Sequence, residues 1–160
     1  YPLDADGLTH VARRGIETLK GASGPRILTP HPGEAGRLLR VSSTEVQADR
    51  FTAAKELAAR YDATVILKGN GSIVCCGELT ALCTAGNAGM ASGGMGDVLS
   101  GIGGALLAQG LSPWDAARLA TVLHGAAADR AVVWQGLHAL LAADLLDHLG
   151  GRRVVPVFFR

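Results

Sequence analysis

The chain has 160 residues, a hydrophobic fraction of 48%, 22 glycines and a formal net charge of +1 at pH 7. This length suits one domain that buries a substantial core. The near-neutral charge argues against a nucleic-acid face or a membrane-surface patch, and no apolar run approaches the roughly 18 residues that cross a bilayer. Three cysteines without CxxC spacing indicate thiols of a reducing compartment. We therefore expect a cytoplasmic protein with no membrane or nucleic-acid partner.

Short apolar runs alternate with stretches of helical spacing along the chain. Strands are expected at residues 1–4, 26–29 and 64–67, and a hairpin about Gly77 joins 72–76 to 78–83. Helices are expected at residues 7–20, 33–40, 113–133 and 137–149, and directly behind the 87–97 loop. One longer helix is expected to begin at a Ser42–Glu45 capping box and to carry Phe51 and Tyr61 on its apolar stripe. This alternation predicts βαβ units and a mostly parallel sheet flanked by helices.

Three polar segments follow directly on predicted strands. They are Asp4-Ala5-Asp6, residues 29–34 (TPHPGE) and residues 68–72 (KGNGS). Ligands of parallel sheets bind outside the carboxyl ends of the strands, so we expect these segments to gather along one edge.

The glycine-rich loop Asn87 to Asp97 (NAGMASGGMGD) runs into a helix with apolar residues at three- and four-residue steps. Small residues let its amides point into one concavity, and the helix N-terminus adds free N–H groups and a positive dipole. Gly101, Gly103 and Gly104 each cost about 1 kcal/mol in a helix interior, which suggests that this helix packs closely against a neighbour. The loop matches neither GxxxxGK[ST] nor GxGxxG.

Asp97 has two readings. A carboxylate in the first turn can complement the helix dipole or act as an N-cap. Alternatively, it is a general base that takes the proton of a substrate hydroxyl while the amides hold a phosphoryl group. The convergence of the other polar segments on this edge favours the second reading.

The remaining polar residues each have a structural alternative. Asp4 and Asp6 could cap the following helix, His31 could be a hydrogen-bonded turn residue, and Glu34 could complement a helix dipole. Lys68 is either a solvated charge or an ammonium that reaches a phosphate. His124 reads as a satisfied core histidine rather than a ligand. No metal-ligand spacing occurs in the sequence.

Five motifs follow one another along the chain: DAD (4–6), TPHPGE (29–34), KGNGS (68–72), NAGMASGGMGD (87–97) and HGAAAD (124–129). In this combination and order, they resemble those of the NAD(P)H-hydrate dehydratases of the ribokinase-like superfamily. The similarity reaches from the first residue to about Leu149. Met95 stands where many relatives carry Ser or Thr, so a hydroxyl contact to phosphate is missing at this position.

The resemblance implies that ADP or ATP phosphorylates the hydroxyl of hydrated NADH or NADPH (NAD(P)HX), and that phosphate elimination then restores the nicotinamide. Asp97 would be the base and would contact the substrate together with His31. The adenine nucleotide would be held by Lys68, Gly69, Asn70, Gly71, Ser72, Gly94 and Gly96. Mg²⁺ would accompany the phosphates, with no protein ligand identified.

The resemblance also has implications for chain organisation. Residues 1–150 would be the C-terminal portion of a ribokinase-like domain, and residues 151–160 a tail. The chain begins without Met, so we expect a fragment of a longer polypeptide, with an epimerase domain fused upstream in some relatives and assembly into homo-oligomers. Two other functions stay open: a ribokinase-like kinase for a vitamin precursor, and a nucleotide-binding fragment without catalytic activity.

Overall fold

A computed structural model of the chain describes residues 1–19 and 24–150, so the expected tail at 151–160 lies outside the described residues. Its strands are β1 (Pro2–Leu3), β2 (Ile27–Leu28), β3 (Thr64–Leu67), β4 (Ser72–Cys76) and β5 (Leu79–Cys83). The α-helices are α1 (Ala5–Arg14), α2 (Pro32–Leu39), α3 (Ser43–Ala48), α4 (Arg50–Tyr61), α5 (Met95–Ala108), α6 (Pro113–Gln135) and α7 (Ala142–His148), with 3-10 turns at Ile16–Leu19, Ala88–Met90 and Leu137–Ala139.

The five strands form one mixed sheet in the order β1-β2-β3-β4-β5. β1, β2 and β3 run parallel, whereas β4 pairs antiparallel with β3 on one side and with β5 on the other, the β4–β5 pair being the predicted hairpin. The short connection at residues 68–71 permits only an antiparallel return, because a parallel pair needs a crossover of a dozen or more residues. The α/β class is confirmed, with the parallel pairing confined to the three strands that end in polar segments.

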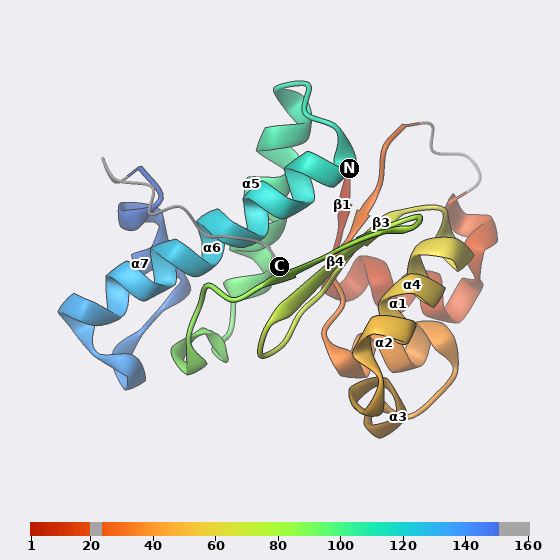
Figure 1. Cartoon of the computed structure of the whole chain (residues 1–160), viewed down its shortest axis with the longest axis horizontal. Helices are drawn as coiled ribbons and strands as arrows, with labels where there is room; N and C mark the ends of the chain where they lie inside the picture. The colour runs from red at the N-terminus through yellow and green to blue at the C-terminus, as the bar shows by residue number, and fades with distance from the viewer. Residues whose placement is uncertain (20–23, 151–160) are drawn as a thin grey trace.

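Helices cover both faces of the sheet (Figure 1), with α1 to α4 on one side and α5 to α7 on the other. The alternation of side chains along β3 shows why, since Val65 and Leu67 join the cluster with α1, α2 and α4, whereas Ile66 joins the cluster with α5 and α6. A third cluster links α5, α6 and α7 around Met95 and Leu145. Buried side chains on both faces therefore fix the positions of α2 and α5 relative to the strand ends.

The longer helix expected after the Ser42–Glu45 capping box is two helices. The capping box is present, but α3 ends at Ala48 and Asp49 then caps α4 by accepting a hydrogen bond from the Thr52 N–H. The new start changes which residues face the core, and Phe51 is 48% exposed, so its predicted place on the apolar stripe is wrong. Tyr61 is buried as predicted.

Two other helices are shorter than predicted. The helix expected at 7–20 ends at Arg14, because Gly15 adopts a φ of 82° and its N–H bonds to Val11. The segment expected as one helix at 137–149 is a 3-10 turn followed by α7. Among residues 1–19 and 24–150, no helix is long and apolar enough to span a membrane.

The glycines of α5 bear out the expected close packing in part. A Cβ on Gly104 would contact Pro2 of β1 at 3.4 Å, and one on Gly103 would approach Ile27 at 3.9 Å. Gly101 differs, because a Cβ there would have no described neighbour within 4 Å. Two of the three glycines thus face the sheet, where α5 crosses β1.

Candidate functional site

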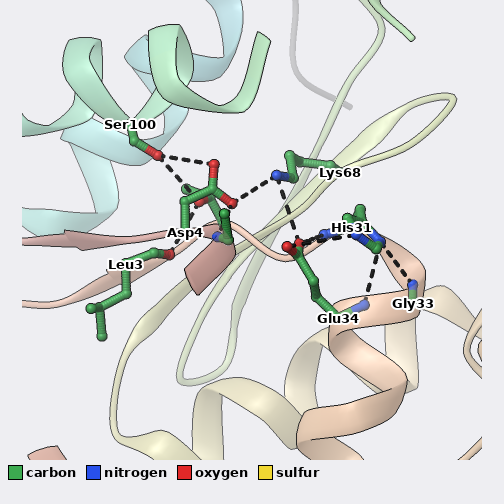
Figure 2. Close-up of polar contacts among 9 residues, drawn as sticks. Leu3, Asp4, His31, Gly33, Glu34, Lys68 and Ser100 are labelled. Carbon is green, nitrogen blue, oxygen red and sulfur yellow. Dashed lines mark hydrogen bonds and ion pairs between the residues drawn. The ribbon is translucent and has the colours of Figure 1, made fainter. Parts of the chain in front are cut away.

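The carboxyl ends of β1, β2 and β3 meet as predicted, and Lys68 lies between two carboxylates there (Figure 2). Its Nζ is 2.8 Å from Asp4 Oδ1 and 3.8 Å from Glu34 Oε2. The side chains of Asp4 and Glu34 are only 10% and 6% exposed. The Lys68 ammonium is therefore a partner of buried carboxylates, and its reading as a solvated charge is wrong.

Hydroxyl groups connect this cluster to α5. Ser100 Oγ donates to Asp4 Oδ2 at 3.4 Å and lies 3.3 Å from Thr29 Oγ1, which donates to the Leu3 carbonyl. Asp4 also caps α1 by accepting from the Ala5 N–H at 2.9 Å. One carboxylate thus joins α1, α5 and the end of β3. The sequence reading missed Ser100, because a serine inside an apolar helix carries no signal of its partner.

His31 has a structural role at the start of α2. Its Nδ1 accepts hydrogen bonds from the Gly33 and Glu34 N–H groups, and Glu34 Oε2 accepts from the His31 N–H at 2.8 Å. This reciprocal capping box confirms the turn reading of His31 and the first-turn reading of Glu34. Because Nδ1 accepts in the neutral imidazole, the proton is on Nε2. The side chain is 51% exposed, and its Nε2 lies 3.6 Å from Glu34 Oε1.

The N-terminus of α5 presents free amides at the same edge. Gly94 is the N-cap, with φ 83° and no side-chain capping bond. Among the described residues, the N–H groups of Met95, Gly96 and Asp97 have no hydrogen-bond acceptor. A Cβ on Gly96 would overlap Asp4 Oδ2 and lie 3.1 Å from Lys68 Nζ, so only glycine lets α5 approach the cluster this closely. The first turn of α5 can therefore hold an anion beside Lys68.

Asp97 is the third residue of α5, so it is a first-turn acid and not the N-cap. Its side chain is exposed, and its carboxylate has no hydrogen bond or ion pair with any described residue. An acid of this kind complements the helix dipole. It also keeps a free lone pair that can accept a proton.

Beneath this turn, Met95 and His124 are buried. Met95 is 4% exposed and packs among residues of α6 and α7, so its side chain points into the protein. His124 is 7% exposed, and its Nε2 has no hydrogen-bond partner among the described residues. Burial lowers the pKa of His124 to about 4, a hydrogen bond to the Met95 backbone raises it, and the Lys68 charge lowers it. His124 is thus a core histidine as predicted, but the expectation that its polar atoms are satisfied is wrong.

Asp129 of the HGAAAD motif anchors the glycine-rich loop. Its two carboxylate oxygens accept from the Gly86 N–H and from Asn87 Nδ2, both at 2.9 Å. Asn87 Oδ1 in turn accepts from the Gly89 N–H at 3.0 Å. On the same helix, a Cβ on Gly125 would lie 2.6 Å from the Ala85 backbone. Helix α6 therefore fixes the segment that leads into the α5 turn, a role that the sequence did not reveal.

The turn at residues 68–71 joins β3 to β4 and also carries free amides. The Lys68 N–H donates to the Pro30 carbonyl at 2.8 Å, whereas the N–H groups of Gly69, Asn70 and Gly71 have no acceptor among the described residues. Gly69 and Gly71 adopt φ values of 153° and 71°, which favour glycine. Free amides thus occur both in this turn, which begins at Lys68, and in the first turn of α5 beside the Lys68 ammonium.

The fold of this chain also occurs in a solved structure of a ribokinase-like protein. A ribokinase-like superfamily protein from Enterococcus faecalis V583 superposes with a TM-score of 0.74 at 24% identity, over 92% of this chain and 50% of that one. At this identity the likeness shows the fold alone. The mixed sheet with helices on both faces is therefore a ribokinase-like fold.

Within that class, the family model described as NAD(P)H-hydrate dehydratase matches residues 2–150, and the chain belongs to this family. It is 54% identical over 125 residues to the bifunctional NAD(P)H-hydrate repair enzyme Nnr of Escherichia coli (strain K12), covering 78% of this chain and 24% of that protein. It also resembles the ADP/ATP-dependent NAD(P)H-hydrate dehydratase from Bacillus subtilis, co-crystallized with ATP/Mg²⁺, with a TM-score of 0.82 and 38% identity over 92% of this chain and 52% of that one. The chain thus spans about a quarter and about half of these relatives.

Proposed function

We propose that this protein carries out the ADP- or ATP-dependent dehydration of hydrated NADH and NADPH, a repair reaction that returns the reduced nicotinamide. Family membership supports the reaction class. The observation that carries the proposal is the exposed, unpartnered carboxylate of Asp97 in a helix turn whose amides are free. A base beside an anion site is the minimum that phosphoryl transfer to a hydroxyl requires.

In the first step, the oxygen of the substrate hydroxyl attacks the terminal phosphorus of the nucleotide, and the Asp97 carboxylate accepts the proton of that hydroxyl. The bond from that phosphorus to the bridging oxygen breaks, and ADP leaves as AMP or ATP leaves as ADP. The amides of Met95, Gly96 and Asp97 and the nearby Lys68 ammonium stabilise the negative charge on the transferred group. Phosphate, a better leaving group than hydroxide, then departs with the former hydroxyl oxygen, and loss of a ring proton restores the double bond.

The nucleotide and the substrate bind on either side of Asp97 in this proposal. The turn Lys68 to Ser72, together with Gly94 and Gly96, holds the phosphates of the adenine nucleotide. His31 faces the hydrated nicotinamide cofactor with its Nε2–H, while Nδ1 continues to cap α2. This division uses the two sets of free amides for the nucleotide and the exposed imidazole for the substrate.

Mg²⁺ would travel with the nucleotide. The described residues contain no group of three or more His, Cys, Asp or Glu that could hold a metal ion. Mg²⁺ does not need such a cluster, because it commonly takes one or two carboxylates and completes its shell with phosphate oxygens and water. The bound ion would neutralise charge on the phosphates.

The proposal extends to organisation in the cell. We place the protein in the cytoplasm, as a homo-oligomer, with residues 1–150 forming the C-terminal portion of the dehydratase domain. An NAD(P)HX epimerase domain upstream would fit the bifunctional name of the E. coli relative. Size-exclusion chromatography with light scattering tests the oligomer.

The test of the reaction incubates the intact protein with hydrated NADH and either ADP or ATP, with Mg²⁺ present. Recovery of the near-ultraviolet absorbance of reduced nicotinamide, with release of inorganic phosphate, supports the proposal. Nucleotide consumption without recovery, and with a stable phosphate ester formed on a vitamin precursor, would instead indicate a kinase. Nucleotide binding without consumption of any substrate would indicate a binding module.

A further inference from the structure

Arg50, the first residue of α4, forms hydrogen bonds with the backbone at the turn of residues 68–71. Its Nη1 donates to the Asn70 carbonyl at 2.8 Å, and its Nη2 donates to the Leu67 carbonyl at 3.1 Å. The guanidinium thus bridges the two carbonyls that flank Lys68 and Gly69. An arginine on a helix surface gives no sign of this contact in the sequence.

The contact also explains Gly69. A Cβ at this position would lie 2.7 Å from Arg50 Nη2 and 3.0 Å from its Cζ, so the guanidinium occupies the space that any other side chain would need. Gly69 has a φ of 153°, which itself favours glycine. The turn and Arg50 therefore fit one another closely.

The direction of the carbonyls determines the direction of the amides. In a planar trans peptide, C=O and N–H point to opposite sides. Because the Asn70 carbonyl points at Arg50, the Gly71 N–H points away from it. That N–H has no acceptor among the described residues, whereas the Lys68 N–H, opposite the Leu67 carbonyl, donates to the Pro30 carbonyl at 2.8 Å. Arg50 thus holds the Asn70 carbonyl on one side of the turn and leaves the Gly71 N–H open on the other.

The charge of Arg50 adds to this effect. No carboxylate among the described residues forms an ion pair with it, and its Nε is buried without a hydrogen-bond partner. A guanidinium stays protonated under all ordinary conditions. Its positive charge lies on the carbonyl side of the turn and favours an anion bound on the side of the free Gly71 N–H.

We propose that Arg50 is a positioning residue for the phosphate groups of the nucleotide, acting through the carbonyls of Leu67 and Asn70 without touching the ligand. The inference rests on the nucleotide-binding role proposed for the turn. The ligand chemistry it requires is a diphosphate, as in ADP or inorganic pyrophosphate.

The test compares Arg50→Met with Arg60→Met in the intact protein. Arg60 is a matched control, because it lies on the same helix and its Nη1 donates to the carbonyls of Leu38 and Leu39, far from the turn. We expect Arg50→Met to raise the Kd for ADP by about tenfold or more, and Arg60→Met to change it by less than about twofold. Turnover at saturating ADP should be nearly unchanged in both, and Tm should fall similarly. Arg50→Lys keeps the charge but bridges the carbonyls poorly, so it should recover part of the affinity.

Amide NMR shifts supply a readout that does not depend on catalysis. Pyrophosphate and ADP should shift the signals of Gly69, Asn70 and Gly71 in the wild type and in Arg60→Met, much less in Arg50→Met, and to an intermediate extent in Arg50→Lys. Unshifted signals in the wild type, or Arg50 variants that bind ADP as the wild type does while losing Tm, would overturn the inference. If the wild type shows the shifts but does not dehydrate hydrated NADH, the inference stands and the proposed reaction fails.

Discussion

The carboxylate of Asp4 occupies the space beside Gly96 into which any larger residue would have to extend its side chain. Asp4 cannot simply move away, because it holds Lys68 at 2.8 Å and caps α1. Gly96→Ala should therefore displace either α5 or the Asp4–Lys68 pair. We expect the Kd for ADP to rise by about tenfold or more, equivalent to roughly 1.4 kcal/mol, measured by isothermal titration calorimetry.

Gly101→Ala provides the control on the same helix. Gly101 is exposed, and nothing described lies within 4 Å of its Cβ position. Alanine should raise the free energy of unfolding by about 0.5–1 kcal/mol, because it restricts the unfolded chain and favours the helix. Unchanged ADP affinity in both glycine variants would contradict the anion site at the start of α5.

Lys68→Met leaves two nearly buried carboxylates, Asp4 and Glu34, without their shared cation. Removing one partner of such a pair costs about 3 kcal/mol or more, so the urea midpoint should fall sharply, whereas Lys55→Met on the exposed face of α4 should change it little. Adding Asp4→Asn should recover part of the loss, and a double-mutant cycle measures that coupling. Additive effects of the two substitutions would show that the ion pair contributes nothing.

Asp97→Asn keeps the shape of the side chain and removes the base. Turnover of hydrated NADH should fall by about 10² or more, while the Kd for ADP stays close to the wild-type value. Asp115→Asn is the control, because Asp115 has the same first-turn position in α6. Near-normal turnover in Asp97→Asn would remove Asp97 from the proposed mechanism.

His124 should make the protein sensitive to mild acid. Its pKa is about 4 in the folded protein, below the usual 6.5, because burial opposes the charged form. The unfolded chain therefore binds the proton first, and the free energy of unfolding should fall as the pH drops from about 6.5 to about 4, by roughly 3 kcal/mol in total. His124→Gln should flatten this part of the stability curve. An equal slope in the variant would assign the sensitivity to other groups.

The sequence predicts which polar segments meet at the sheet edge better than it predicts the helices. Asp4, His31 and Lys68 each follow an apolar run, and parallel strands bring such positions to one edge whatever the helices do. The break between α3 and α4 was missed because Asp49 looks like an ordinary polar residue within a helical stripe, although its side chain caps α4.

Long-range partners are the other limit. Asp4 meets Lys68 and Ser100 across 64 and 96 positions of sequence, and Arg50 reaches the turn that follows β3. None of these side chains carries a local pattern that names its partner. His31 shows the opposite case, because the local sequence predicts a hydrogen-bonded turn residue and the structure confirms it as the N-cap of a capping box.

The Asp4–Lys68–Ser100 cluster also has a consequence for how the chain reaches its native state. It joins residues from β1, β3 and α5, so it forms only when these distant parts have come together, and contacts of such high sequence separation form slowly. Partly folded chains lack the cluster and should not recognise nucleotide. ADP would then select fully assembled molecules and draw the folding equilibrium toward them.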